Sequence, residues 1–237
     1  MPAAERAAPV GAWTDPFGRA GRGRRAPAEG GLRAVHQRVL RSFATVGRPP
    51  TAAELGEAAA PYGKPADVVL AELHIGDFLR LDATGQVRAA YPFSAVPTSH
   101  VVQIDDGPRV HAMCAIDALG IAAMLGTGIT ITSADPRTGE PTAVAVAADG
   151  RKAVWEPATT VVFAGQQAPG EPCSGPGTGP VPAAADVCCG YISFFTSRAS
   201  ATDWARAHPE VTGHVLKQAR ALQLGTRIFG PVLADAG

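Results

Sequence analysis

The chain lacks a net charge, a long hydrophobic run and the paired cysteine spacing of a zinc site. Its 237 residues include 21 Lys or Arg and 21 Asp or Glu, so the formal net charge is zero. A balanced charge gives no overall field that would draw the protein to nucleic acid or to an anionic membrane. No stretch approaches the roughly 20 apolar residues that cross a bilayer. No Cys-x-x-Cys spacing occurs, which excludes a zinc knuckle.

The first 30 residues lack a continuous apolar core, and their charges are scattered. They therefore do not match a secretory signal, and we expect a cytoplasmic protein whose four cysteines are reduced. The same segment is rich in Ala, Gly, Pro and Arg and has little apolar surface to bury. We expect residues 1–30 to form a disordered tail.

Residues 31–93 have the pattern of a helical unit. Apolar residues recur at helical spacing after residue 31, and Thr51 with Glu54 forms a capping box at the start of a second helix. A third helix is expected in the segment from residue 65 to 82, followed by a turn at 82–85 and a strand at 86–91. Three helices and a hairpin predict a winged-helix-like domain over residues 31–93.

Nucleic-acid binding is not expected from this domain, although its third helix occupies the position of a DNA-recognition helix. That helix carries Asp67, Glu72 and Asp77, with no Lys or Arg between Lys64 and Arg80. Phosphate contacts need cations at such positions. We therefore expect a structural or covering role for the domain.

Residues 94–237 predict an α+β catalytic domain, a mixed β-sheet core packed with helices. Short β-branched or alternating runs occur between residues 99 and 164, interrupted by an apolar helix expected over 112–125. A Gly/Pro-rich connection over 165–184 contains Cys173, which we interpret as an incidental or exposed thiol. A strand is expected at 188–196, a helix at 199–207 and a long helical stretch at 211–229.

Cys114 and Asp117, at the start of the apolar helix, are the most informative residues. In a helix, residues three apart lie on one face with Cβ atoms about 5–6 Å apart, so the thiol and the carboxyl can reach one bound atom. The helix start would lower the pKa of the Cys114 thiol from its usual value of about 8.5. A thiolate beside a proton carrier indicates chemistry on a thiophilic metal. The plainer alternatives are a cysteine that fills the core and an aspartate bonded to a backbone amide or an arginine.

The adjacent pair Cys188-Cys189 is the second candidate feature. Adjacent cysteines rarely meet the geometry of a disulfide without strain. In a strand they would point to opposite faces, so at most one should line a given site, and two buried free thiols are the alternative. His111 lies three residues before Cys114, which would suit a Cys–His nucleophile, but no Asn or Asp is placed to orient its ring.

The segment His111-Ala-Met-Cys114-Ala-Ile-Asp117-Ala-Leu-Gly120, the pair Cys188-Cys189 before Phe194-Phe195, and the Trp204 to Pro209 stretch together resemble the organomercurial (alkylmercury) lyase family. The resemblance runs from about residue 31 to residue 229. It implies two catalytic cysteines and one aspartate, which by matching motif are Cys114, Cys188 and Asp117 and which would also hold the mercury of substrate and product. Cys189 would be a neighbour of less certain role. Two departures are Met113, where the family often has an aromatic residue, and the segment 132–134, which lacks a structural cysteine that some members have.

The resemblance implies cleavage of a carbon–mercury bond by protonolysis. A thiolate of Cys188 or Cys114 displaces the thiol ligand of R–Hg⁺, the second thiol binds mercury, and its proton passes to Asp117. Asp117 then protonates the departing carbon, which gives a hydrocarbon and Hg(II). A largely apolar pocket would raise the pKa of Asp117 from about 3.9 and make this relay workable at neutral pH.

The resemblance implies no cofactor. The implied partners are an organomercurial substrate, cytosolic thiols that exchange with bound Hg(II), and a mercuric reductase as acceptor. A non-enzymatic alternative is a thiol-based protein that binds or senses copper or mercury, and a third is a cysteine hydrolase built on Cys114 and His111.

Overall fold

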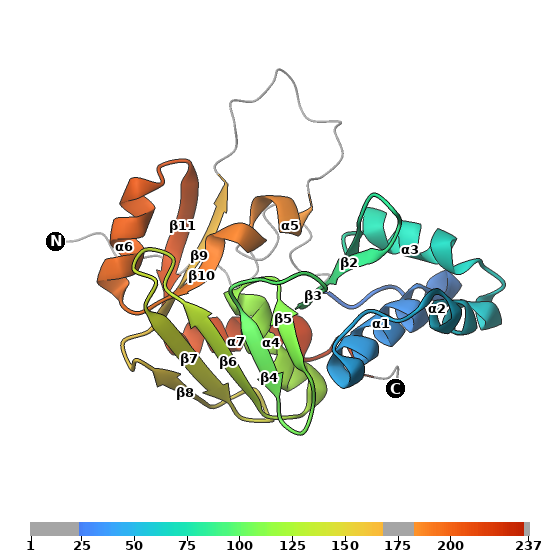
Figure 1. Cartoon of the computed structure of the whole chain (residues 1–237), viewed down its shortest axis with the longest axis horizontal. Helices are drawn as coiled ribbons and strands as arrows, with labels where there is room; N and C mark the ends of the chain where they lie inside the picture. The colour runs from blue at the N-terminus through green and yellow to red at the C-terminus, as the bar shows by residue number, and fades with distance from the viewer. Residues whose placement is uncertain (1–23, 168–182, 235–237) are drawn as a thin grey trace, which may run out of the picture.

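The computed structural model describes residues 24–167 and 183–234 of the chain and has an α+β fold. Figure 1 shows three helices at one end of the molecule and most strands of two antiparallel sheets toward the other, with two further helices behind the large sheet. The expected α+β class is confirmed. Every helix in the described ranges is too short or too polar to cross a bilayer.

The N-terminal unit contains the expected three helices and hairpin. Its elements are η1 (Glu29–Gly31), α1 (Leu32–Val46), α2 (Ala52–Ala59), η2 (Ala60–Tyr62), α3 (Ala66–Ile75), β1 (Leu79–Leu81) and β2 (Val87–Ala90). The capping box is confirmed, because Thr51 Oγ1 accepts from Glu54 N and the Glu54 carboxylate accepts from Thr51 N. The third helix ends earlier than expected, because Asp77 takes a left-handed φ of 58° and the chain turns there into β1.

The segment before η1 differs from the expected tail. Residues 1–23 lie outside the described part of the chain, but Ala26 is fully buried and Arg24 contacts Asp77. The expectation of a disordered segment through residue 30 therefore does not hold for residues 24–30. An arginine and an alanine from a low-complexity stretch are buried because the N-terminal unit and the sheet provide partners for them.

The large sheet joins the N-terminal hairpin to the rest of the protein. Its remaining strands are β3 (Phe93–Ser94), β4 (Val101–Ile104), β5 (Arg109–Ala112), β6 (Ile129–Ala134), β7 (Pro141–Val146) and β8 (Ala153–Glu156). Within the described residues eight strands form the order β1-β2-β3-β5-β4-β6-β7-β8, and all neighbours are antiparallel, so the sheet is not mixed. The sheet crosses the boundary expected at residue 93. Phe43 of α1 stacks on Phe93 of β3, with ring centroids 5.3 Å apart, and fixes the helices to this sheet.

The small sheet contains β9 (Val161–Gln167), β10 (Ile192–Phe195) and β11 (Val211–Leu216), in the order β10-β9-β11. Helix α6 (Arg198–Ala207) covers it through Trp204, which packs edge-on against Phe163. The expected helix over 211–229 is therefore wrong for its first part. Val211–Leu216 pairs with β9 from Gln167 to Val162, and the resulting backbone hydrogen bonds and burial of Val211 override a weak helical pattern.

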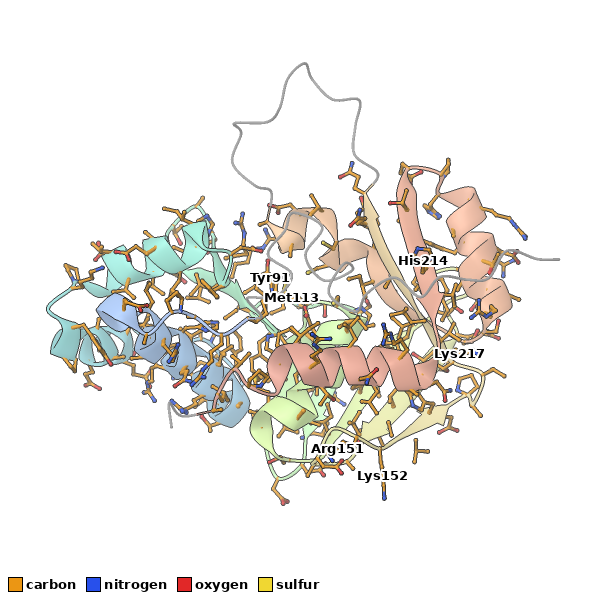
Figure 2. The ribbon with its side chains drawn as sticks, turned by 180° about the vertical axis from the view of Figure 1, so that it is seen from behind. Tyr91, Met113, Arg151, Lys152, His214 and Lys217 are labelled. Carbon is orange, nitrogen blue, oxygen red and sulfur yellow. The ribbon has the colours of Figure 1, made fainter. Side chains whose placement is uncertain are left out.

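Helices α4 (Ala115–Leu125) and α7 (Gln218–Phe229) pack together at the centre of the molecule. Figure 1 shows them behind the large sheet, and Figure 2, seen from behind, shows α7 in front. A Cβ atom on Gly120 of α4 would lie 2.7 Å from the carbonyl oxygen of Gly225 in α7. The two helices therefore touch through their backbones, which places the start of α4 close to the C-terminal half of α7.

Candidate active site

Cys114 lies at the junction between β5 and α4. Its backbone is extended, with φ of −157° and ψ of 176°, and it is the N-cap of α4, because its Sγ accepts from Asp117 N at 3.4 Å. The helix expected over 112–125 thus begins after Cys114, since Ala112 still pairs with Phe93 in the sheet. The cap geometry nevertheless turns the Cys114 thiol toward the first turn of α4, where Asp117 lies.

Burial dominates the electrostatics of Cys114. The residue is 2% exposed, and this desolvation raises the pKa of its thiol well above the usual value, with further increases from Cys189 and Asp117. The expected lowering of this pKa at the helix start is therefore wrong. One weak hydrogen bond from an amide does not compensate for removing a thiolate from water beside two other acidic groups.

Asp117 is a buried carboxyl that lacks full hydrogen bonding. It is 7% exposed, and its Oδ2 has no hydrogen-bond partner among the described residues. Burial raises the pKa of Asp117 to about 7, and the positive charge of Arg24 opposes part of that rise. The expectation that an apolar pocket raises this pKa is confirmed. At neutral pH such a carboxyl is poised both to accept a proton and to release one.

The vicinal cysteines follow the one-turn helix α5 (Ala184–Val187). Cys188 N donates to Ala184 O, and Cys189 begins the short helix η3 (Cys189–Tyr191), which leads into β10. Both thiols are free and buried. The strand expected over 188–196 is wrong for its first four residues, so the Cys188 and Cys189 side chains are not held on opposite faces of a strand.

Three side chains from distant parts of the chain meet around one point. The Sγ atoms of Cys114 and Cys189 and a carboxylate oxygen of Asp117 all lie within 4.8 Å of one another. Cys188, which the resemblance selects, lines the same cavity but is not in this three-residue cluster. Burial, followed by the charge of Cys189, raises the pKa of Cys188 to about 12. The geometry thus brings Cys114 and Asp117 together as expected and adds Cys189, while the assignment of Cys188 stays a prediction.

The cavity around this cluster is small, with a volume of about 40 Å³. Its walls are largely apolar, and Leu224, Ile228 and Phe229 of the C-terminal region supply one side. A second cavity of about 300 Å³ opens beside it, lined by residues that include Met113 and Arg80. Cys189 lines both cavities, so it lies between the buried cluster and the larger space.

Arg24 also lines the small cavity, and no sequence pattern predicts it there. It is one of several arginines in a stretch without apolar periodicity, so no local pattern separates it from Arg22 or Arg25. Cys173 lies outside the described residues. Thr98 N donates to His111 Nδ1 at 3.1 Å, and His111 is absent from the described lining of the cavity, which gives no support to a Cys–His pair.

The chain is similar to known proteins in sequence and in fold. The family model described as alkylmercury lyase matches residues 93–230. The alkylmercury lyase of Staphylococcus epidermidis is 32% identical over 170 residues, which cover 72% of this chain and 71% of that protein. The alkylmercury lyase of Bacillus cereus is 32% identical over 168 residues, covering 71% and 69%.

The fold has a match among solved structures. The crystal structure of the mercury-bound form of MerB2 aligns with a TM-score of 0.65 and 23% identity, covering 88% of this chain and 93% of that chain. At this identity the match concerns the fold. The family model spans more than half of the chain and the relatives most of it, so the chain belongs to the alkylmercury lyase family.

Proposed function

We propose that this protein cleaves the carbon–mercury bond of organomercurials by protonolysis. The observation that carries the proposal is the convergence of two buried thiols and one buried carboxyl around a single point. Sulfur ligands suit a soft metal such as mercury. A carboxyl with a pKa of about 7 suits proton transfer at neutral pH.

The chemistry follows from the groups that the cavity holds. An organomercurial enters as R–Hg–SR′, and the sulfur of Cys114 or of the vicinal pair replaces the thiol ligand, which leaves as R′SH with the cysteine proton. The second cysteine then binds mercury, and its proton passes to the carboxylate of Asp117. Two sulfur donors add electron density to mercury, and Asp117 returns the proton to carbon as the Hg–C bond breaks. The products are R–H and Hg(II) held between two sulfurs.

The second sulfur comes from the vicinal pair. Motif matching selects Cys188, and the distance to Cys114 and Asp117 selects Cys189. Substitution separates the two, because Cys188→Ser and Cys189→Ser remove one thiol at a time and leave its neighbour in place. Loss of turnover in one variant, with activity retained in the other, identifies the mercury ligand.

Product release requires thiol exchange, because Hg(II) held by two sulfurs does not dissociate into water at a useful rate. The 300 Å³ cavity beside Cys189 offers space for an incoming thiol. Small cytosolic thiols, or the cysteines of a mercuric reductase, would take the metal from there. The chain's own residues bind the substrate and move the proton, and no cofactor enters the proposed reaction.

The test is to incubate the purified protein with phenylmercury and an excess of a small thiol, and to measure benzene and released Hg(II). Wild type should form both, and Asp117→Ala should still bind mercury but form no benzene. Asp117→Ala that turns over like wild type would instead support a protein that only binds metal. Folded wild-type protein that forms no benzene would defeat the lyase proposal.

A further inference from the structure

A buried polar network lies between the N-terminal unit and the vicinal cysteines. It consists of Arg24, Asp77 and Tyr91, which belong to no motif. Asp77 is 4% exposed and Tyr91 is fully buried. Figure 2 labels Tyr91 close to Met113, where the three-helix unit meets the sheet. The network lies beside the small cavity, because Arg24 also lines that cavity.

The three side chains contact one another directly. Arg24 Nη1 donates to Asp77 O at 2.6 Å and to Asp77 Oδ2 at 3.1 Å, and its guanidinium lies 4.0 Å from the centre of the Tyr91 ring. The Tyr91 hydroxyl donates to Asp77 Oδ1 at 3.0 Å. Each carboxylate oxygen of Asp77 therefore has a fixed partner, and Arg24 supplies the balancing positive charge.

Asp77 and Tyr91 also accept hydrogen bonds from the start of α5. Ala184 N donates to Asp77 Oδ2 at 3.2 Å, and Ala185 N donates to the Tyr91 hydroxyl oxygen at 3.0 Å. First-turn amides have no partner within a helix, and the N-cap residue Ala183 has no side chain that could accept from them. Asp77 and Tyr91 thus provide from distant elements the cap that the local sequence lacks.

This cap lies one helical turn from the catalytic sulfurs. Ala184, whose amide binds Asp77, accepts at its carbonyl oxygen from Cys188 N at 2.9 Å. Because α5 has only four residues, movement of its first turn moves Cys188 and Cys189 directly. Small displacements matter here, since a misplacement of about 1 Å can cost on the order of 100-fold in rate.

We propose that Asp77 and Tyr91, held in place by Arg24, are positioning residues that keep the vicinal cysteines in reach of Cys114 and Asp117. This inference rests on the proposed lyase function. Burying an arginine, an aspartate and a tyrosine costs free energy. If the position required only close packing, apolar side chains would fill the same space as well or better. The network instead fits a requirement for a defined geometry of the segment 184–189.

Tyr91→Phe is the sharpest test, because it removes one hydroxyl and keeps the ring beneath Arg24. We expect kcat for benzene formation from phenylmercury to fall at least tenfold, with KM changed less than threefold, at a temperature where the variant is folded. We also expect iodoacetamide to alkylate Cys188 and Cys189 faster than in wild type, with the rate at Cys114 unchanged. Peptide mass spectrometry measures the three rates. Tyr62→Phe, at an exposed tyrosine of the same unit, is the matched control and should behave as wild type.

A second pair of variants covers the case in which Tyr91→Phe does not fold. Asp77→Asn keeps the size of the side chain and weakens its bond to Ala184 N, and Arg24→Lys keeps the cation. We expect Asp77→Asn to resemble Tyr91→Phe, and Arg24→Lys to retain more kcat than Arg24→Ala. If folded Tyr91→Phe or Asp77→Asn keeps kcat within twofold of wild type and unchanged alkylation rates, the positioning role is wrong. If wild type forms no benzene, the lyase proposal is wrong instead. The alkylation rates then still test whether Asp77 and Tyr91 hold the start of α5 in place.

Discussion

Replacing Asp117 by Asn should make the protein more stable while abolishing turnover. The carboxyl is buried and its pKa rises from 3.8 to about 7 on folding. Above pH 7 the folded protein holds a carboxylate that water would solvate better, and a pKa change of this size corresponds to roughly 4 kcal/mol of lost stability. Asparagine has nearly the same shape and cannot ionise, so it removes that cost.

The sign and the pH range follow from the two pKa values. Between about pH 4 and pH 7 the unfolded chain releases the Asp117 proton and the folded protein keeps it, so wild type loses stability as pH rises. From pH 5 to pH 8 the difference in unfolding free energy between Asp117→Asn and wild type should grow by roughly 2–3 kcal/mol. Urea unfolding followed by circular dichroism, with a reductant present, measures this difference at each pH.

Asp135 provides the matched control. It is 1% exposed, and although burial acts to raise the pKa of its carboxyl, bonds from Thr196 N and Arg137 N lower it overall. Its stabilising contribution is therefore present above the unfolded pKa and is lost as pH falls, so Asp135→Asn should be less stable than wild type at pH 7. If the stability of Asp117→Asn and wild type changes in parallel from pH 5 to pH 8, Asp117 is not a buried, neutralised carboxyl and the proton relay loses its physical basis.

Further expected outcomes concern the thiols, the helix contact and acid stability. Cys114→Ser should abolish hydrocarbon formation by gas chromatography while leaving the thermal midpoint within a few degrees, and activity in this variant would contradict the two-sulfur mechanism. Gly120→Ala should lower the unfolding free energy by about 1–3 kcal/mol, because the added methyl group meets the backbone of α7; an unchanged urea midpoint would show that the helices can separate at no cost. Burial lowers the pKa of His36 and of His100 to about 4, so stability should fall as pH drops from 6.5 to 4, by up to roughly 3 kcal/mol for each. His100→Gln should reduce this loss of stability at low pH. An equally steep loss of stability in the variant would show that His100 is not buried in its neutral form.

The sequence indicated the α+β class, the capped second helix and the pairing of Cys114 with Asp117, because these depend on local spacing. A capping box and an i, i+3 pair lie within one turn of chain, where residue identity alone sets the geometry. The strand at Val211–Leu216 was missed because its partner β9 lies more than forty residues earlier in the chain. Arg24 could not be predicted because its partners are also distant in the chain. Its place beside the site depends on Asp77 and Tyr91 and on none of its neighbours in the sequence.

The vicinal cysteines show where a pattern can mislead. The run from Cys188 to Thr196 alternates well enough to suggest a strand, but the first residues form turns that follow α5. The choice between two adjacent sulfurs depends on how the preceding segment is anchored. That anchor comes from Asp77 and Tyr91, so no inspection of residues near 188 alone could supply it.

The contact between Gly120 and Gly225 has a consequence for the size of substrate that the enzyme accepts. Because the backbones of α4 and α7 approach closely at Gly120 and Gly225, Cys114 and the apolar wall of Leu224 and Phe229 form one rigid side of the cavity. The opposite side of the cavity is the short segment that carries Cys188 and Cys189, which a few hydrogen bonds anchor. Bulkier organic groups must therefore make room by shifting this segment. The range of organic groups that the enzyme accepts should depend on how firmly those hydrogen bonds anchor it.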